Sequence, residues 1–253
     1  MRIFPQLFNR THMPRFYCPQ PLVVGESIAL PDPVAHHAWV VRLQPGAGLT
    51  LFNGDGGEYT AELAELDKKR ATARILAFAA RDRELPYEIT LAQALPEAAK
   101  MDWIIEKAVE MGVAAIQPLA AQRCVVRLAG ERAEKRAAHW QAVIVAASEQ
   151  SGRNRLARLA PLDGFTAWIG QHDLHKRILL TPRATASLPD WARHQPPQAL
   201  TLLIGPEGGY TEQEEDAAIA RGAIALSIGP RVLRTETAGI AAVAALNALW
   251  GGM

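Results

Sequence analysis

Three short segments near the C-terminus contain residue types that can build a ligand site. They are residues 180–183 (LTPR), 204–209 (IGPEGG) and 228–237 (IGPRVLRTET), and each follows an apolar run. Such runs between amphipathic stretches are typical of the buried strands of a parallel sheet. Because the carboxyl ends of parallel strands lie at one edge of the sheet, we expect the three segments to meet there and to form a binding site.

The glycine-rich segment 204–209 is a poor candidate for binding phosphate. It has neither the Lys-Ser/Thr pair of a P-loop nor GxGxxG spacing. Thr211 and Glu214 match a capping box that satisfies the free N–H groups of the next helix. Glu207, Glu212, Glu214 and Glu215 would repel an anion from that helix end. A ligand with an adenosine and a cationic sulfonium, such as S-adenosylmethionine, meets no such penalty. A tight turn that binds nothing is the alternative interpretation.

The third segment has a sharper chemical signal. Arg231, Arg234 and Glu236 lie among apolar residues immediately before a helix of small residues. Arginines at the rim of a sheet can hold phosphates and polarise carbonyl oxygens. The alternative is that both are helix-flanking charges paired with Glu236. The Ala/Gly face of the helix that follows suggests close packing, either in the core or between two copies of the chain.

The elements that must position these segments fall into two regions. From residue 15 to 80 the pattern predicts short strands at 27–31, 49–53, 58–66 and 70–78 and one helix at 33–43, which together indicate a small β-barrel. Barrels of this kind often bind nucleic acid, but a fold alone does not establish function. The charged residues 81–84 mark the expected boundary.

After this boundary, strands and helices alternate. Strands are predicted at 88–95, 113–119, 177–182, 199–206 and 223–229, and helices at 132–150, 212–221 and 237–250, with another helix that ends at residue 111. The pattern predicts an α/β domain with a parallel sheet covered on both faces.

Composition limits the classes of function. The 253 residues are 49% hydrophobic and 21% charged, with a formal net charge of +1, so the whole chain is not a basic nucleic-acid binder and any RNA contact must be local. Cys18 and Cys124 have no CxxC spacing and the seven histidines no ligand spacing, so we expect free thiols and no metal. No signal peptide or membrane-spanning run is visible, and we expect a cytoplasmic protein.

The chain resembles a known family at this point. LLIGPEGGYTEQE followed by IGPRVLRTETA is similar to the paired signature of the RsmE family, a branch of the SPOUT methyltransferases. MPRFYC (13–18), KMDWIIEKAVEMGV (100–113), QRCVV (122–126) and SEQSGRNR (148–155) extend the similarity over nearly the whole chain. The resemblance implies a PUA-like β-barrel RNA-binding domain at 1–80 and a SPOUT domain with a C-terminal trefoil knot at 81–253. Family members look as though they begin near Met13, so residues 1–12 are expected to be an extension, or Met13 to be the true start.

The resemblance also implies an activity and partners. These are S-adenosyl-L-methionine-dependent methylation of uridine N3 in 16S ribosomal RNA, acting on the small ribosomal subunit as a homodimer. Another RNA site, a non-catalytic RNA-binding protein and a nucleotide-dependent oxidoreductase are the alternatives. The absence of a dinucleotide fingerprint argues against the last, and the converging loops against the second.

Site residues are carried over position by position. The residues expected to contact the cofactor are Leu180, Thr181, Pro182, Ile204, Gly205, Pro206, Glu207, Gly208, Gly209, Ile228, Gly229, Val232, Leu233 and Thr235. The residues expected to contact RNA are Arg15, Arg123, Arg153, Asn154 and Arg155. For catalysis, Arg234 or Arg231 would stabilise the uracil anion, and Glu236 or Glu207 is a candidate base. A bulky residue at Gly208 is expected to block the adenosine.

Overall fold

The chain forms two compact units. The computed structural model describes residues 13–68 and 70–252, so the expected extension at 1–12 lies outside the described residues. The first unit contains the chain up to Arg83 together with Ser148–Leu156, and the second contains the rest. A segment from the middle of the chain therefore belongs to the N-terminal unit, which sequence periodicity did not indicate.

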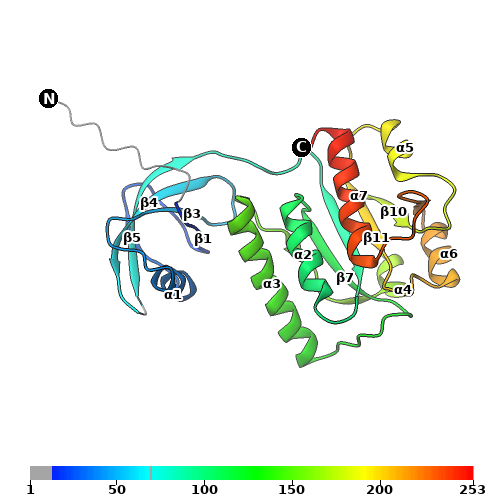
Figure 1. Ribbon diagram of the computed structural model, residues 1–253, viewed down its shortest axis with the longest axis horizontal. Helices are drawn as coiled ribbons and strands as arrows, with labels where there is room; N and C mark the ends of the chain where they lie inside the picture. The colour runs from blue at the N-terminus through cyan, green and yellow to red at the C-terminus, as the bar shows by residue number, and fades with distance from the viewer. Residues whose placement is uncertain (1–12, 69, 253) are drawn as a thin grey trace. The chain divides into compact units, whose positions relative to one another are not determined.

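The first unit is a five-stranded sheet with one helix (Figure 1). Its elements are β1 (Arg15–Tyr17), β2 (Ser27–Ala29), α1 (Asp32–Val40), β3 (Gly48–Phe52), β4 (Glu58–Leu66) and β5 (Ala71–Ala79). The strand order is β1-β3-β4-β5-β2, where only β1 and β3 are parallel. Leu49, Leu51, Leu63 and Ile75 are fully buried in its core. Among the described residues, β1 and β2 are the two edge strands of this sheet and do not pair with each other.

The middle segment is attached to β1 by hydrogen bonds. The Arg15 guanidinium donates to the Asn154 Oδ1 at 2.7 Å and to the Arg153 carbonyl at 3.2 Å. The Tyr17 backbone N–H donates to the Glu149 Oε1 at 2.8 Å. The segment thus supplies hydrogen-bond acceptors for the Arg15 side chain and the Tyr17 backbone.

The second unit is built on a parallel sheet. Its elements are β6 (Ile89–Ala94), α2 (Lys100–Glu110), β7 (Ala115–Ala120), α3 (Glu131–Ser151), β8 (Arg158–Leu159), β9 (Asp163–Gly164), α4 (Phe165–Ile169), β10 (Lys176–Leu180), α5 (Leu188–Arg193), β11 (Leu200–Ile204), α6 (Glu212–Ala220), β12 (Ile224–Leu226) and α7 (Thr235–Trp250). The order is β12-β10-β11-β6-β7-β8, with β9 also beside β7, and every pair is parallel. The predicted α/β parallel sheet is confirmed.

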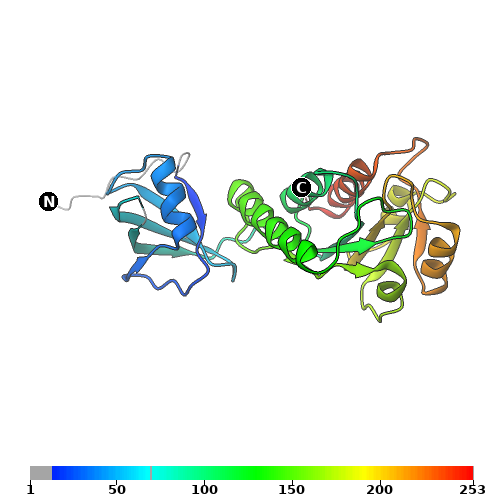
Figure 2. The same cartoon turned by 90° about the horizontal axis from the view of Figure 1, so that it is seen from below.

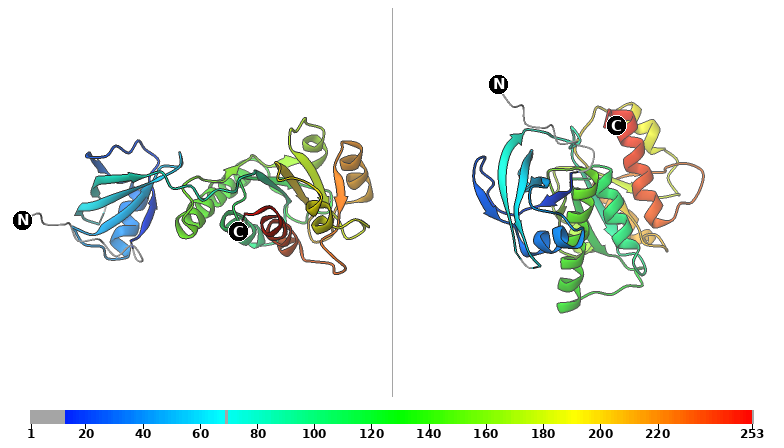
Figure 3. Two further views of the ribbon diagram at one scale, coloured as in Figure 1. Left: turned by 90° about the horizontal axis from the view of Figure 1, so that it is seen from above. Right: turned by 60° about the vertical axis from the view of Figure 1, so that its left-hand side comes forward.

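Helices cover both faces of this sheet. Figure 2 shows α2 and α7 on one face and α4 on the other, and Figure 3 shows α2 and α7 side by side, in agreement with their contacts. Helix α2 packs through an apolar stripe, because Ile104, Ile105 and Ala108 are buried. In α7, a Cβ added to Gly239 would lie 3.1 Å from the Leu91 side chain, so the small residue permits close packing on the sheet.

Helix starts follow their capping chemistry. The predicted capping box of α6 is confirmed: the Thr211 hydroxyl accepts from the Glu214 backbone N–H, and the Glu214 carboxylate accepts from the Thr211 backbone N–H. The last helix was expected to begin at residue 237 but begins at Thr235. Its N-cap is Arg234, which makes no side-chain capping bond, so the usual sequence signal is absent.

Candidate active site

A pocket of about 670 Å³ lies where β10, β11 and β12 end. The three segments that follow these strands line it together, so their predicted convergence is confirmed. All the residues expected to contact the cofactor or to take part in catalysis line this pocket. Four further lining residues were not predicted as site residues: Lys100, Tyr210, Glu215 and Ala238. The volume is within the usual range for small-ligand sites.

The glycine-rich segment keeps a conformation that needs its glycines. Gly209 has φ +66°, in the left-handed region. A Cβ at Gly205 would lie 3.0 Å from both the Gly209 Cα and the Tyr210 backbone N. The Tyr210 hydroxyl donates to the Ile204 carbonyl at 3.0 Å, and complete burial raises the pKa of this phenol well above its ordinary value. The loop is therefore held folded back on itself at the end of β11.

A buried pair of side chains connects this loop to α7. The Thr235 hydroxyl donates to the Gly205 carbonyl at 2.6 Å, and the Gln93 side-chain amide donates to the Thr235 Oγ1 at 2.9 Å. Gln93 is fully buried at the end of β6. The start of α7 is thus fixed against the ends of two strands, and the segment before it is directed into the pocket.

The carboxylates that line the pocket differ in their partners. Glu207 accepts from the Lys100 Nζ at 2.6 Å and from the Glu97 backbone N–H at 3.1 Å. Burial alone would raise the pKa of Glu207, but these hydrogen bonds outweigh it and the pKa is lowered. Glu215 is paired with Arg183 at 2.7 Å. By contrast, the Oε2 of Glu236 is buried and has no hydrogen-bond partner among the described residues.

Arg231 and Arg234 are exposed at the pocket. Neither makes an ion pair with Glu236 within the described part of the chain. The alternative that the arginines only neutralise Glu236 is therefore not supported. Their guanidinium groups are available to an anion that enters the pocket.

Lys100 could have been found from the sequence by its position. It opens α2 directly after β6, which lies beside β11 in the sheet. The carboxyl end of β6 therefore contributes to the same edge as the three segments. Its ion pair with Glu207, and the negative charge of Glu236 nearby, raise the pKa of the Lys100 ammonium.

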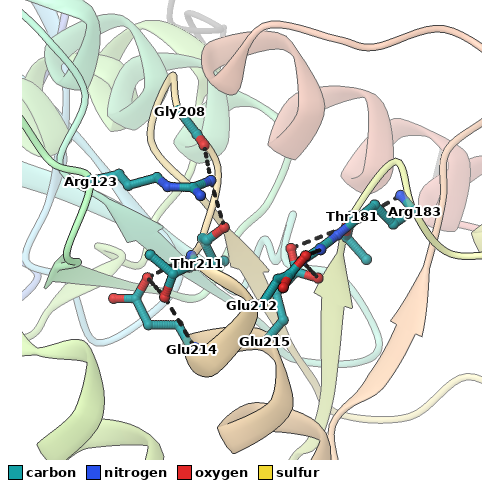
Figure 4. Close-up of polar contacts among 9 residues, drawn as sticks. Arg123, Thr181, Arg183, Gly208, Thr211, Glu212, Glu214 and Glu215 are labelled. Carbon is teal, nitrogen blue, oxygen red and sulfur yellow. Dashed lines mark hydrogen bonds and ion pairs between the residues drawn. The ribbon is translucent and has the colours of Figure 1, made fainter.

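Arg123 has a different setting from the RNA contact that was expected. Its Nη1 donates to the carbonyl of Gly208 at 2.8 Å and to that of Tyr210 at 3.1 Å (Figure 4). A Cβ at Gly208 would lie 3.4 Å from the aliphatic part of Arg123, which is ordinary contact. The added carbon would therefore meet Arg123, and the expectation that a bulky residue at Gly208 blocks the adenosine stays a prediction.

The other residues expected to contact RNA belong to the first unit and are unequally exposed. Arg153 and Asn154 are only 3% and 2% exposed, so they are not surface residues in this structure, and their contact with RNA stays a prediction. Arg15 is bound to Glu58 at 2.6 Å as well as to Asn154. Arg155 alone of the three consecutive residues is exposed. The packing of this segment on β1 buries most of it.

The described residues hold no group of three or more His, Cys, Asp or Glu side chains placed to bind a metal ion. No helix among them has the length and apolarity needed to cross a membrane. Cys18 and Cys124 are free and buried.

Comparison with known proteins identifies the family. Residues 83–247 match the model of the RNA methyltransferase domain, and residues 30–76 match the RNA methyltransferase PUA domain. Ribosomal RNA small subunit methyltransferase E of Bacillus subtilis is 30% identical over 229 residues, which cover 85% of this chain and 87% of that protein. The Mycobacterium bovis protein of the same name is 34% identical over 222 residues, which cover 85% of this chain and 83% of that protein.

The chain belongs to the ribosomal RNA small subunit methyltransferase E family. The predicted RsmE resemblance, the PUA-like β domain and the RNA methyltransferase class are thereby confirmed.

Two solved structures of similar proteins bear on the pocket. The Neisseria gonorrhoeae ribosomal RNA small subunit methyltransferase E, bound to S-adenosyl methionine, is 41% identical with a TM-score of 0.88 and covers 94% of this chain and 98% of that one. A putative methyltransferase from Legionella pneumophila, in complex with the bound cofactor SAM, is 35% identical with a TM-score of 0.89 and the same coverage.

Proposed function

We propose that this RsmE family member transfers the methyl group of S-adenosylmethionine to N3 of a uridine in 16S ribosomal RNA. The observation that carries this proposal is the pocket lined by the three segments, in a chain that matches S-adenosylmethionine-bound relatives over 94% of its length. A homodimer, a trefoil knot and a cytoplasmic location are part of the same proposal.

The residues present fit the cofactor. Leu180, Ile204, Ile228 and Leu233 give the pocket apolar walls for a flat base. A Cβ added at Gly205 would lie 3.0 Å from backbone atoms of the next turn, so a side chain there would force the main chain to shift. Carboxylates on the lining match a ligand with a sulfonium centre, which an anion-binding loop would not accommodate.

When bound, S-adenosylmethionine supplies an electrophilic methyl carbon attached to sulfur. The new bond joins N3 to that carbon while the carbon–sulfur bond breaks, and the N3 proton must go to a base. Glu236 is the better candidate because its Oε2 is buried without a partner, whereas Glu207 already accepts from Lys100 and Glu97. Arg231 and Arg234 stabilise the negative charge that develops on the uracil carbonyl oxygens.

The test is nucleoside mass spectrometry of 16S ribosomal RNA from cells with and without the gene. We expect 3-methyluridine to disappear on deletion and to return on expression of the wild-type chain. The proposed substrate would be contradicted if deletion removed a methylated nucleoside from a different RNA. It would also be contradicted if deletion left all methylation of 16S ribosomal RNA unchanged. Sedimentation of the purified chain at several concentrations tests the homodimer.

A further inference from the structure

Arg183 makes contacts that connect two of the pocket segments. It lies three residues after the end of β10, and its guanidinium reaches the first turn of α6 (Figure 4). The Nη1 is 2.8 Å from the Glu212 Oε1, and the Nη2 is 2.7 Å from the Glu215 Oε2. Arg183 itself is not among the residues that line the pocket, so its connection to the pocket runs through its partners.

Glu215 carries the connection into the pocket wall. Its side chain is 13% exposed and lines the pocket. Its second oxygen, Oε1, accepts from the Thr181 hydroxyl at 3.3 Å, and the Arg183 backbone N–H in turn donates to the Thr181 Oγ1 at 3.3 Å. These contacts form a closed set that joins the segment after β10 to the helix that follows the glycine-rich segment.

The two ion pairs of Arg183 differ in environment. Its partner Glu212 is 76% exposed, so this pair is screened by water and contributes little. Glu215 is largely buried, and removing its cation would leave a carboxylate without its main partner at the pocket. The hydrogen bond to Glu215 is also the main cause of the raised pKa of Arg183.

We propose that Arg183 is a positioning residue for the methyl donor, acting through Glu215 and Thr181. This inference rests on the proposed function. By holding Glu215 and Thr181 together, Arg183 sets the spacing of the two segments between which the cofactor binds, before the cofactor arrives. The planar fork of arginine suits this task, because one guanidinium meets two carboxylates at once, which a lysine ammonium does less well.

The experiment measures S-adenosylmethionine binding to the full chain by calorimetry. We expect Arg183→Gln to raise the Kd roughly tenfold, because misplaced contacts weaken binding even when they are remote from the chemistry. Arg183→Lys should recover only part of the affinity. Glu212→Gln, the matched control that removes only the exposed partner, should change the Kd about twofold or less. Glu215→Gln should weaken binding, and the double variant with Arg183→Gln should be no weaker than the worse single variant.

A kinetic measurement separates positioning from a purely structural role. In Arg183→Gln the KM for S-adenosylmethionine should rise while kcat at saturating cofactor stays at the wild-type level. Wild-type binding by Arg183→Gln, or an unchanged KM with a lower melting temperature, would overturn the inference. If Arg183→Gln does not fold, Glu215→Gln with unchanged affinity overturns it equally. No binding by the wild-type chain would instead refute the proposed function.

Discussion

At the scale of single residues, Glu236 and Glu207 have opposite surroundings in the same pocket. One carboxylate oxygen of Glu236 is buried without a partner, whereas Glu207 is held by Lys100 and has a lowered pKa. A base must accept a proton, and strong donors to a carboxylate make it a weaker base. The structure thus distinguishes two acids that the sequence left equivalent.

Replacing Glu236 with Gln should lower kcat by roughly 10²–10⁴-fold, the usual contribution of a positioned base. The variant rate should increase with pH, since N3 then ionises in solution without help. Single-turnover methylation at several pH values measures this. Glu207→Gln is the comparison and should affect cofactor affinity more than the rate. A wild-type rate for Glu236→Gln would remove the residue from the mechanism.

Glu149 has a pKa that predicts a specific pH dependence of stability. Burial raises its pKa above the ordinary value of 4.5, and the hydrogen bond from the Tyr17 N–H only partly offsets this. The folded state therefore prefers the protonated acid, and its stabilising contribution is lost as pH rises through the raised pKa. Glu149→Gln stays neutral throughout. Relative to this variant, the wild-type melting temperature should fall as pH increases from about 4.5, and a constant difference would contradict the assignment.

At the scale of elements, the glycine-rich turn after β11 is the part of the site with the least room for change. A Cβ at Gly205 meets backbone at 3.0 Å, whereas a Cβ at Gly208 meets the flexible Arg123 side chain at 3.4 Å. Only the first requires the main chain to move. Arg123 also donates to the carbonyls on both sides of Gly209, so the turn is supported from outside the pocket.

Gly205→Ala should therefore reduce S-adenosylmethionine affinity by about tenfold or more, since overpacking of this kind costs about 1–3 kcal/mol. Gly208→Ala should cause a smaller loss. Calorimetry of both variants, with circular dichroism to establish that each is folded, makes the comparison. Equal losses in the two variants would mean that crowding of the main chain is not the cause.

Elements also determine what was predictable from the sequence. Long apolar strands and amphipathic helices such as β11 and α2 have clear periodicity, and the segments that follow the strands could be placed at one edge. The helices α4 and α5 and the strands β8 and β9 are too short to show a period, and none was predicted. Lys100 was not predicted as a site residue because the sequence around it indicates only a helix.

Burial of Arg153 was not predictable for a different reason. Basic residues after a helix normally face solvent, and no local pattern distinguishes those that do not. Here the segment packs against β1, more than 130 positions earlier in the chain, through Arg15. Long-range contacts of this kind leave no trace in local periodicity.

At the scale of the whole molecule, RNA binding must be assigned to local cations because the formal net charge is only +1. Among the three consecutive residues 153–155 that were expected to bind RNA, only Arg155 is exposed. Arg155→Ala should weaken RNA association and reduce the slope of log K against log salt by about one. Cofactor affinity should not change. Filter binding at several salt concentrations measures the slope, and an unchanged slope would exclude a phosphate contact.

The inclusion of residues 148–156 in the first unit has a consequence for biosynthesis. Domains usually fold in order as the chain leaves the ribosome, the N-terminal one first. Here Arg15 and Tyr17 cannot meet Asn154 and Glu149 until more than half of the 253 residues have been made. The N-terminal unit must therefore wait for its final partners while β6, α2 and β7 of the second unit are already outside the ribosome. A nascent chain arrested before residue 148 should carry this unit in an incomplete, protease-sensitive form.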